Sequence, residues 1–318
     1  MNNMKMRRLS TLCLMLLFLA ISIAIPSAGP ARVLRISYNP LPFNLPSMIL
    51  RREGYLEKAL LHLGWQVEWL SNLQTGPLMS EAMAAGALDL APVMGDTSAV
   101  IARVAGNDLT VLWPYSLAPK AFAIVAPAGG HVRQVPDLAG RKIGLPVGTT
   151  AHYLLVKALT REHLKPAQVD LINMSVTEAA VAVASGKLDA AVLVEPMLSK
   201  ILAGGAVVLV RDGSDLIGGM TVAAVRGTFY RQNPDIIKAY QKALQKAGGY
   251  LMEKPDAAMR IAAEETKLPA ELLKSITAKY RFVSISRTTM LHELTVVINF
   301  LADQGLIARR PRLLDMVR

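Results

Sequence analysis

The sequence contains almost no cysteine: Cys13 is the only one among its 318 residues. It lies inside the apolar run from Leu12 to Ile25, whereas the cysteine of a lipoprotein would follow such a run, so we expect no lipid anchor. Removal of residues 1–31 on export would leave a mature chain of about 287 residues without any cysteine. That absence excludes a disulfide and a thiol nucleophile in the mature protein.

The segment ahead of the apolar run is basic, with Lys5, Arg7 and Arg8 and no acidic residue. A basic start followed by an apolar stretch too short to span a membrane is typical of a secretory signal. We therefore predict a signal peptide, cleaved near Ala28 or Ala31, and a periplasmic protein.

Aromatic residues are scarce, at 5% of the chain, while the net charge is +11. Three of the basic residues belong to the predicted signal, so about +8 remains on the exported protein. Surfaces that bind nucleic acid combine clustered basic residues with aromatic side chains that stack on bases, and here the basic residues are scattered. We therefore expect a solvated basic surface and no nucleic-acid partner.

The sequence also lacks the signatures of common catalytic and metal sites. No pair among the five histidines has the spacing of metal ligands; they are His62, His131, His152, His163 and His292. There is no Gly-x-Ser-x-Gly elbow, no Walker loop and no dinucleotide fingerprint. We therefore predict no catalytic residue, no metal and no cofactor, and we favour a binding protein over an enzyme.

The sequence does contain alternating strand and helix patterns. The expected strands include 32–38, 66–70, 120–126, 206–210 and 221–225, and the expected helices include 47–63, 76–86, 234–252, 255–265, 269–279 and 287–305. This alternation predicts parallel βαβ units in an α/β fold, and the length of the mature chain predicts two lobes. Strands near 120 and 221 would cross between the lobes. Lobe 1 would then span 32–119, lobe 2 would span 120–220, and the chain would return to lobe 1 over 221–318.

One pattern occurs twice, one hundred residues apart, at Glu81–Ala91 and at Val181–Ala191. Each copy is an alanine-rich helix that ends at a glycine, followed by Leu-Asp and an apolar strand. Each strand leads into a polar turn, Met94–Thr97 in the first copy and Val194–Met197 in the second. Two lobes of one plan would place these turns at matching strand ends, where α/β folds bind ligands. Coincidence among alanine-rich helices is the alternative.

The segment from Gly140 to Leu159 has the pattern of a short buried strand, a turn and a helix. Gly148 allows a sharp bend, and Thr149 and Thr150 are suited to cap the helix. The free N–H groups and the dipole of such a helix start attract anions. The segment is therefore either an anion site or an ordinary capped helix.

With these features the chain resembles the periplasmic solute-binding proteins of ATP-driven (ABC) importers. Within them it is similar to the aliphatic sulfonate, taurine and nitrate group, which includes binders of pyrimidine precursors. The likeness runs from about Val33 to about Asn299, and the stretches that carry it are Gly54–Lys58, Thr75–Met79, Gly86–Asp89, Met94–Asp96, Asp137–Ile143 and Gly148–His152. The resemblance implies a periplasmic-binding-protein type II fold, in which two lobes of mostly parallel sheet are joined by two hinge strands.

The resemblance also implies a function. A monomer of this kind captures a small anionic or zwitterionic solute by lobe closure and delivers it to a membrane permease that works with a cytoplasmic ATPase. Carried onto this sequence, the ligand contacts would be Phe43, Asn44, Gly95, Asp96, Thr97, Gly148, Thr149, Thr150, Ala151 and Glu195. The alternative is an enzyme or a ligand-sensing subunit built on the same fold.

One turn departs from the sulfonate-binding relatives, which often carry Asp-Pro-aromatic where this chain has Glu195-Pro196-Met197. The loss of the aromatic residue indicates a roomier pocket with Met94 and Met220 beside it, unless both methionines fill the core. Asp96 either caps a helix or faces the ligand, and Glu195 is either solvated or in the cleft. If both carboxylates face the cleft, the ligand needs an amine or several N–H groups, because an unpaired buried charge is costly.

Overall fold

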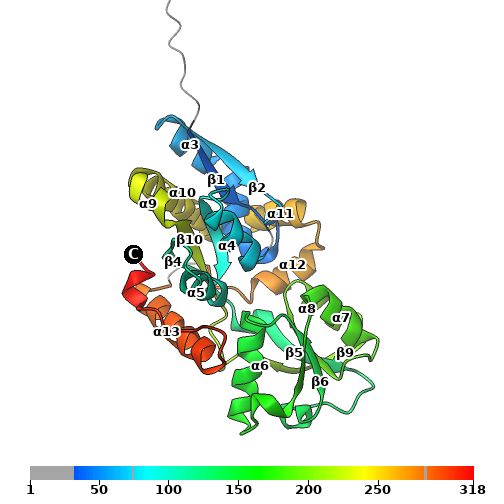
Figure 1. Ribbon diagram of the computed structural model, residues 1–318. Coiled ribbons are helices and arrows are strands. Elements are labelled where there is room, and N and C mark those ends of the chain that lie inside the picture. Colours follow the sequence, from blue (N-terminus) through cyan, green and yellow to red (C-terminus); the bar gives the residue numbers. More distant parts are fainter. Residues whose placement is uncertain (1–31, 74, 283–284) are drawn as a thin grey trace, which may run out of the picture. The chain divides into compact units, whose positions relative to one another are not determined.

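Two five-stranded sheets, each flanked by helices, form the framework of the protein (Figure 1). The structure is a computed structural model and describes residues 32–73, 75–282 and 285–318. The predicted α/β fold with two lobes is confirmed. The predicted signal peptide lies outside the described residues.

The first sheet has the strand order β2-β1-β3-β10-β4. Its strands are β1 (Arg32–Ser37), β2 (Trp65–Leu70), β3 (Leu90–Gly95), β4 (Leu109–Leu117) and β10 (Met220–Arg226). Strands β1 and β3 pair in parallel, whereas β10 runs antiparallel to both of its neighbours. The start of β10 therefore lies at the same sheet edge as the end of β3, with Thr221 opposite Gly95.

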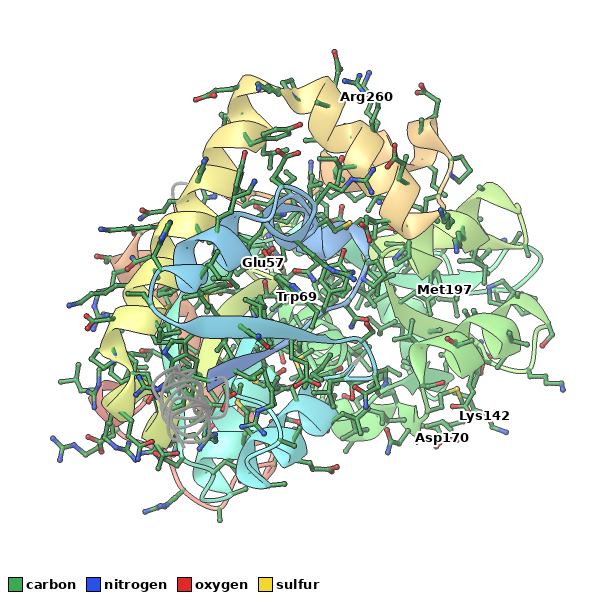
Figure 2. All side chains as sticks on the ribbon, turned by 90° about the horizontal axis from the view of Figure 1, so that it is seen from above. Glu57, Trp69, Lys142, Asp170, Met197 and Arg260 are labelled. Atoms are coloured by element: carbon green, nitrogen blue, oxygen red, sulfur yellow. The ribbon has the colours of Figure 1, made fainter. Side chains whose placement is uncertain are left out.

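The second sheet repeats this plan in the order β7-β6-β8-β5-β9. Its strands are β5 (Phe122–Pro127), β6 (Lys142–Leu145), β7 (Asp170–Asn173), β8 (Ala190–Val194) and β9 (Val207–Asp212). Strand β6 is parallel to β7 and β8, with Lys142 opposite Asp170 (Figure 2). Strand β5 is antiparallel to its neighbours and places Phe122 opposite Val194. In both sheets the antiparallel strand is thus the one that arrives from the other lobe.

Helices cover both sheets. On the first sheet lie α2 (Leu45–Arg52), α3 (Tyr55–Leu61), α4 (Gly76–Ala84), α5 (Asp96–Val104), α9 (Gly227–Gln232), α10 (Pro234–Glu253), α11 (Pro255–Thr266), α12 (Ala270–Thr277) and α13 (Arg287–Asp303). On the second lie α6 (Thr150–Arg161), α7 (Val176–Ala184) and α8 (Met197–Ala203). The four expected C-terminal helices are confirmed as α10 to α13. The single helix expected over 47–63 is wrong: α2 and α3 are separate because Gly54 between them is left-handed, with φ 62°.

The chain passes between the sheets twice, once after β4 and once after β9. The first passage contains the 3₁₀ helix η2 (Pro119–Ala121), and the second spans residues 213–219. The passages lie side by side, since the backbone N–H of Ala118 donates to the carbonyl oxygens of Gly218 and Gly219 at 3.1 and 3.2 Å. A Cβ on Gly219, whose φ is 58°, would come within 2.6 Å of the Ala118 carbonyl oxygen. The strands expected to cross, β5 and β10, each belong to one sheet and directly follow a passage.

The internal repeat has a structural role in both lobes. Helices α4 and α7 are each followed by a glycine with φ 71°, as the pattern predicts. In the first copy the Asp89 carboxylate accepts a hydrogen bond from the backbone N–H of Arg35, at 3.0 Å. In the second copy Asp189 accepts one from the backbone N–H of Lys142, at 2.9 Å. Each aspartate thereby ties its own strand to the neighbouring parallel strand.

The two aspartates provide a matched pair of substitutions. The Asp89 side chain is 1% exposed and also binds the Arg35 and Arg226 guanidinium groups, whereas the Asp189 side chain is 40% exposed. We expect Asp89→Ala to lower the free energy of unfolding by about 3–5 kcal/mol, because two partly buried arginines lose their counter-charge. Asp189→Ala should cost about 1 kcal/mol. Urea unfolding measures both losses, and equal values would contradict the assignment.

Candidate functional site

A cavity of about 150 Å³ lies where strand ends from the two sheets meet. The strands β1, β3 and β8 end at it and the antiparallel strands β5 and β10 begin at it. Its lining residues are Ser37, Asn39, Phe43, Asn44, Gly76, Met79, Val93, Gly95, Phe122, Val194, Gly219, Thr221 and Tyr280. The cavity therefore occupies the position at which α/β sheets bind ligands.

The walls of the cavity are mostly apolar and carry no formal charge. The second sheet contributes Phe122 and Val194, and Tyr280 comes from the segment after α12. Apart from the Tyr280 hydroxyl, the polar side chains come from the first sheet and its loops; they are Ser37, Asn39, Asn44 and Thr221. Among the residues that the structure describes, no Asp, Glu, Lys, Arg or His lines the cavity. A ligand there meets neutral dipoles on one side and hydrocarbon on the other.

A buried network fixes the polar side. The Asn44 amide donates to the backbone carbonyl of Asn39 at 2.9 Å, and its oxygen accepts from the Tyr115 hydroxyl at 3.1 Å. The Tyr115 oxygen in turn accepts from the backbone N–H of Ser47 at 3.0 Å, and burial raises the pKa of this hydroxyl above its ordinary value. Asn44 closes the 3₁₀ helix η1 (Pro42–Asn44), so the network also holds Phe43 at the cavity wall.

Two hydroxyls at the cavity keep capacity for a ligand. The Ser37 hydroxyl donates only to the Met79 sulfur, a weak acceptor, at 3.8 Å. The Thr221 hydroxyl shares one hydrogen bond with Ser116 at 2.7 Å. A hydroxyl offers one donor and two acceptor sites, so both groups can make a further hydrogen bond.

Two helices begin at the cavity wall. Gly76 is the first residue of α4, and Gly95 immediately precedes α5. These helix starts pack together so closely that a Cβ on Gly76 would overlap the Ser98 side chain. Unpaired N–H groups in a first turn, together with the helix dipole, favour an anion nearby.

Asp96 starts α5 and lies beside the cavity without lining it. Its carboxylate accepts hydrogen bonds from the Thr97 backbone N–H at 2.7 Å and from the Thr150 hydroxyl at 3.5 Å. The residue is 2% exposed, and this burial raises the pKa of its carboxyl to about 7, against the opposing effect of those hydrogen bonds. Because Thr150 starts α6, this contact joins the two lobes.

The start of α6 differs in part from its prediction. Gly148 does make the sharp bend, with φ 76°, but the Thr149 hydroxyl donates to the Pro146 carbonyl at 2.7 Å and does not cap the helix. The Thr150 hydroxyl lies 3.9 Å from where a Cβ of the lining residue Gly95 would be, but Thr150 itself does not line the cavity. Thr97, Gly148, Thr149 and Ala151 do not line the cavity.

Glu195 is buried, so the interpretation as a solvated residue is wrong. The residue is 2% exposed and follows Val194 at the end of β8. Its carboxylate accepts hydrogen bonds from the backbone N–H of Ser199 at 3.1 Å and from the Ser199 hydroxyl at 2.7 Å, and it forms an ion pair with Lys279. The cation that this carboxylate needs is therefore supplied by the chain itself.

Of the ten residues predicted as contacts, Phe43, Asn44 and Gly95 line the cavity. Met94 and Met220 are fully buried in the core, so both methionines fill it and neither lines the cavity. The aromatic rings of Phe122 and Tyr280 are lining residues that the sequence analysis missed. The position of ligand sites at strand ends could have pointed to Phe122, since it lies near the start of the strand expected over 120–126, whereas no sequence signal marks Tyr280.

Residues 66–258 match the family model described as NMT1/THI5 like. The chain belongs to this family. A protein of Escherichia coli K12 that bears the name of an aliphatic sulfonates-binding protein is 26% identical to this chain, over 85% of this chain and 83% of its own length. The taurine-binding periplasmic protein of the same strain is 25% identical, over 64% of this chain and 63% of its own length.

Solved structures agree with the fold. The alkanesulfonate-binding protein SsuA from Xanthomonas axonopodis pv. citri, bound to MOPS, superimposes with a TM-score of 0.80 at 23% identity. The match covers 91% of this chain and 98% of that one. The desulfurization enzyme DszB superimposes with a TM-score of 0.69 at 17% identity, over 90% of this chain and 96% of that one, so the fold also occurs in an enzyme.

The part of the chain that the structure describes contains neither a membrane-spanning helix nor a metal-binding cluster. Within residues 32–73, 75–282 and 285–318, no helix has both the length and the apolar character needed to cross a membrane. The same residues contain no group of three or more His, Cys, Asp or Glu side chains arranged to hold a metal ion.

The buried carboxyl of Asp96 predicts a pH dependence of stability. Its pKa is about 7 in the folded protein and near 3.8 ordinarily, so the folded state takes up a proton first as the pH falls. Asp96 therefore lowers stability above about pH 7, and stability should rise as the pH falls from 7 towards 4, by at most about 1.4 kcal/mol per pH unit. Asp96→Asn should abolish this contribution.

Urea unfolding of the wild type and of Asp96→Asn between pH 5 and pH 8 measures the difference directly. The comparison also removes the opposing contribution of His152, whose pKa burial lowers. Parallel pH profiles for the two proteins would refute the assignment.

Proposed function

We propose that this protein is the periplasmic solute-binding component of an ATP-driven importer. In this proposal it captures a small anionic solute in the cavity between its sheets and delivers it to a membrane permease with a cytoplasmic ATPase. The observation that carries the proposal is the cavity itself, formed by strand ends of both lobes. Membership of the family, and relatives named for sulfonate and taurine binding, support the same function.

Neutral dipoles suit the reversible capture of an anion. The starts of α4 and α5 bring partial positive charge to the cavity. The Thr221 hydroxyl can donate to an anion when Ser116 is the donor in their shared bond, and the Ser37 hydroxyl can exchange its weak bond to the Met79 sulfur for one to an anion. Such groups hold an anion without a fixed counter-charge, so release requires only that the lobes open. Of the predicted contacts, we propose Phe43, Asn44 and Gly95 as direct ones.

The remainder of the ligand should be apolar. Phe43, Phe122, Val194 and Tyr280 offer hydrocarbon and aromatic surface and no acceptor charge for an amine. Glu195 is already paired with Lys279, and Asp96 lies outside the cavity wall. We therefore favour a sulfonate or a similar anion with an apolar body over a taurine-like zwitterion.

A binding role is favoured over catalysis by the chemistry of the walls. Within the described chain, the cavity is lined by no carboxylate, histidine or cysteine that could act as a general base or nucleophile. The hydroxyls of Ser37 and Thr221 have no such base among the lining residues beside them. Turnover assays on the bound solute test the enzyme alternative.

A matched pair of ligands tests the substrate class. We expect 1-propanesulfonate to bind about 10- to 100-fold more tightly than 3-amino-1-propanesulfonate, because the ammonium group would be desolvated against apolar walls without a partner. Isothermal titration calorimetry measures both affinities. Equal or tighter binding of 3-amino-1-propanesulfonate would mean that a carboxylate contacts the ammonium group of the ligand. If neither sulfonate binds to the folded protein, the ligand is not a sulfonate of this kind.

Substitutions at the wall test the location. Phe122→Ala should weaken propanesulfonate binding by about tenfold or more, since it removes apolar contact with the ligand body. Val181→Ala is the control, because Val181 is 67% exposed on α7 and does not line the cavity. The same loss in both variants, or in neither, would contradict a ligand site in this cavity.

A further inference from the structure

The segment Lys279–Tyr280–Arg281 connects three parts of the molecule. Arg281 pairs with Leu117, the last residue of β4, through backbone hydrogen bonds of 2.9 and 3.0 Å. Tyr280 lines the cavity, and Lys279 forms the ion pair with Glu195. The segment is thus anchored on the first lobe at the point where the chain leaves it, and its Lys279 side chain reaches Glu195 in the second lobe.

The acceptor side of this pair is prepared within the second lobe. The Glu195 side chain is 0% exposed, and Ser199 gives it two hydrogen bonds, one from the backbone N–H and one from the hydroxyl. The Lys279 side chain keeps 24% exposure and so has access to water. If the lobes separate, Glu195 retains both donors of Ser199 and Lys279 is hydrated, so the pair can break and form again without leaving an isolated charge in the protein.

The residues adjacent to Glu195 and Lys279 in the sequence link their ion pair to the cavity. Val194 precedes Glu195 and lines the cavity from the second lobe, and Tyr280 follows Lys279 and lines it from the first-sheet side. In the structure the ion pair is formed while these two lining residues face the same cavity. The attraction between Lys279 and Glu195 therefore favours the arrangement in which Tyr280 and Val194 close the cavity wall.

We propose that the Lys279–Glu195 ion pair is the catch that holds the lobes closed over the ligand. Both are positioning residues: neither lines the cavity, and they act on the ligand by keeping Tyr280 and Val194 against it. The catch sets how long the ligand stays bound. This inference rests on the proposed function, so the experiment measures lobe opening with and without a ligand.

The test compares Lys279→Met with Lys279→Arg and with Arg52→Met. Lys279→Met keeps the apolar stem and removes the charge, and Lys279→Arg restores the charge. Arg52→Met is the control, since it breaks the exposed ion pair with Glu264 between α2 and α11, within one lobe. Spin labels at Val181→Cys on α7 and Met252→Cys on α10, both 67% exposed, report the distance between lobes in a Cys13→Ser background.

We expect Lys279→Met to raise the dissociation rate of 1-propanesulfonate about tenfold or more while the association rate changes less than threefold. The distance distribution between the labels should shift towards open states, without ligand as well as with it. Lys279→Arg should restore most of both properties, and Arg52→Met should match the wild type. Loss of thermal stability in Lys279→Met with an unchanged distance distribution would overturn the catch, because that is the behaviour of a merely structural pair.

The two proposals fail in different ways. Unchanged label distances and dissociation rates in Lys279→Met, in a protein that binds propanesulfonate, would overturn the catch and leave the proposed function standing. Opening of the lobes by Lys279→Met in a protein that binds neither sulfonate would support the catch and count against the sulfonate class.

Discussion

The backbone contact between the two passages of the chain determines where the strands that follow them begin, and therefore where the cavity lies. Ala118 donates to Gly218 and Gly219, and the left-handed Gly219 allows the second passage to lie directly against the first. Each passage is followed by the antiparallel strand of the sheet that it enters, β5 or β10. The beginnings of β5 and β10 and the ends of their antiparallel neighbours β8 and β3 consequently border one cavity, and Gly219 itself is part of its wall.

Ionised side chains and neutral dipolar groups occupy separate positions around that cavity. Glu195 and Lys279, which adjoin the lining residues Val194 and Tyr280, neutralise each other beside the wall, and burial raises the pKa of Asp96 to about 7. The wall itself holds only neutral groups, in which dipoles of helix starts and hydroxyls face apolar rings. Under the proposed function, an anion would therefore meet no fixed counter-ion among the described lining residues.

Much of the fold could be predicted because it depends on local signals. The Gly-x-Leu-Asp repeat predicted a helix end and a strand, and both copies have the same φ of 71° at the glycine and the same aspartate contact. The break between α2 and α3 was missed because Gly54 lies within a run of good helix formers, and glycine inside such a run does not by itself end a helix. Strand β4 was not predicted, since Pro114 lies within it beside Trp113 and Tyr115.

The candidate site was harder to predict because its parts depend on contacts between residues far apart in the sequence. Phe43, Asn44 and Gly95 were predicted from the resemblance to the solute-binding proteins, but Glu195 could not be assigned without its partner. Lys279 is 84 residues away and lies in a segment that sequence patterns assign to an ordinary helix end. A carboxylate is available to bind a ligand cation only if no cationic side chain of the protein, such as Lys279, already pairs with it. Pairing within the chain removes the reason to expect an amine on the ligand, and under our proposal it makes the same carboxylate part of lobe closure.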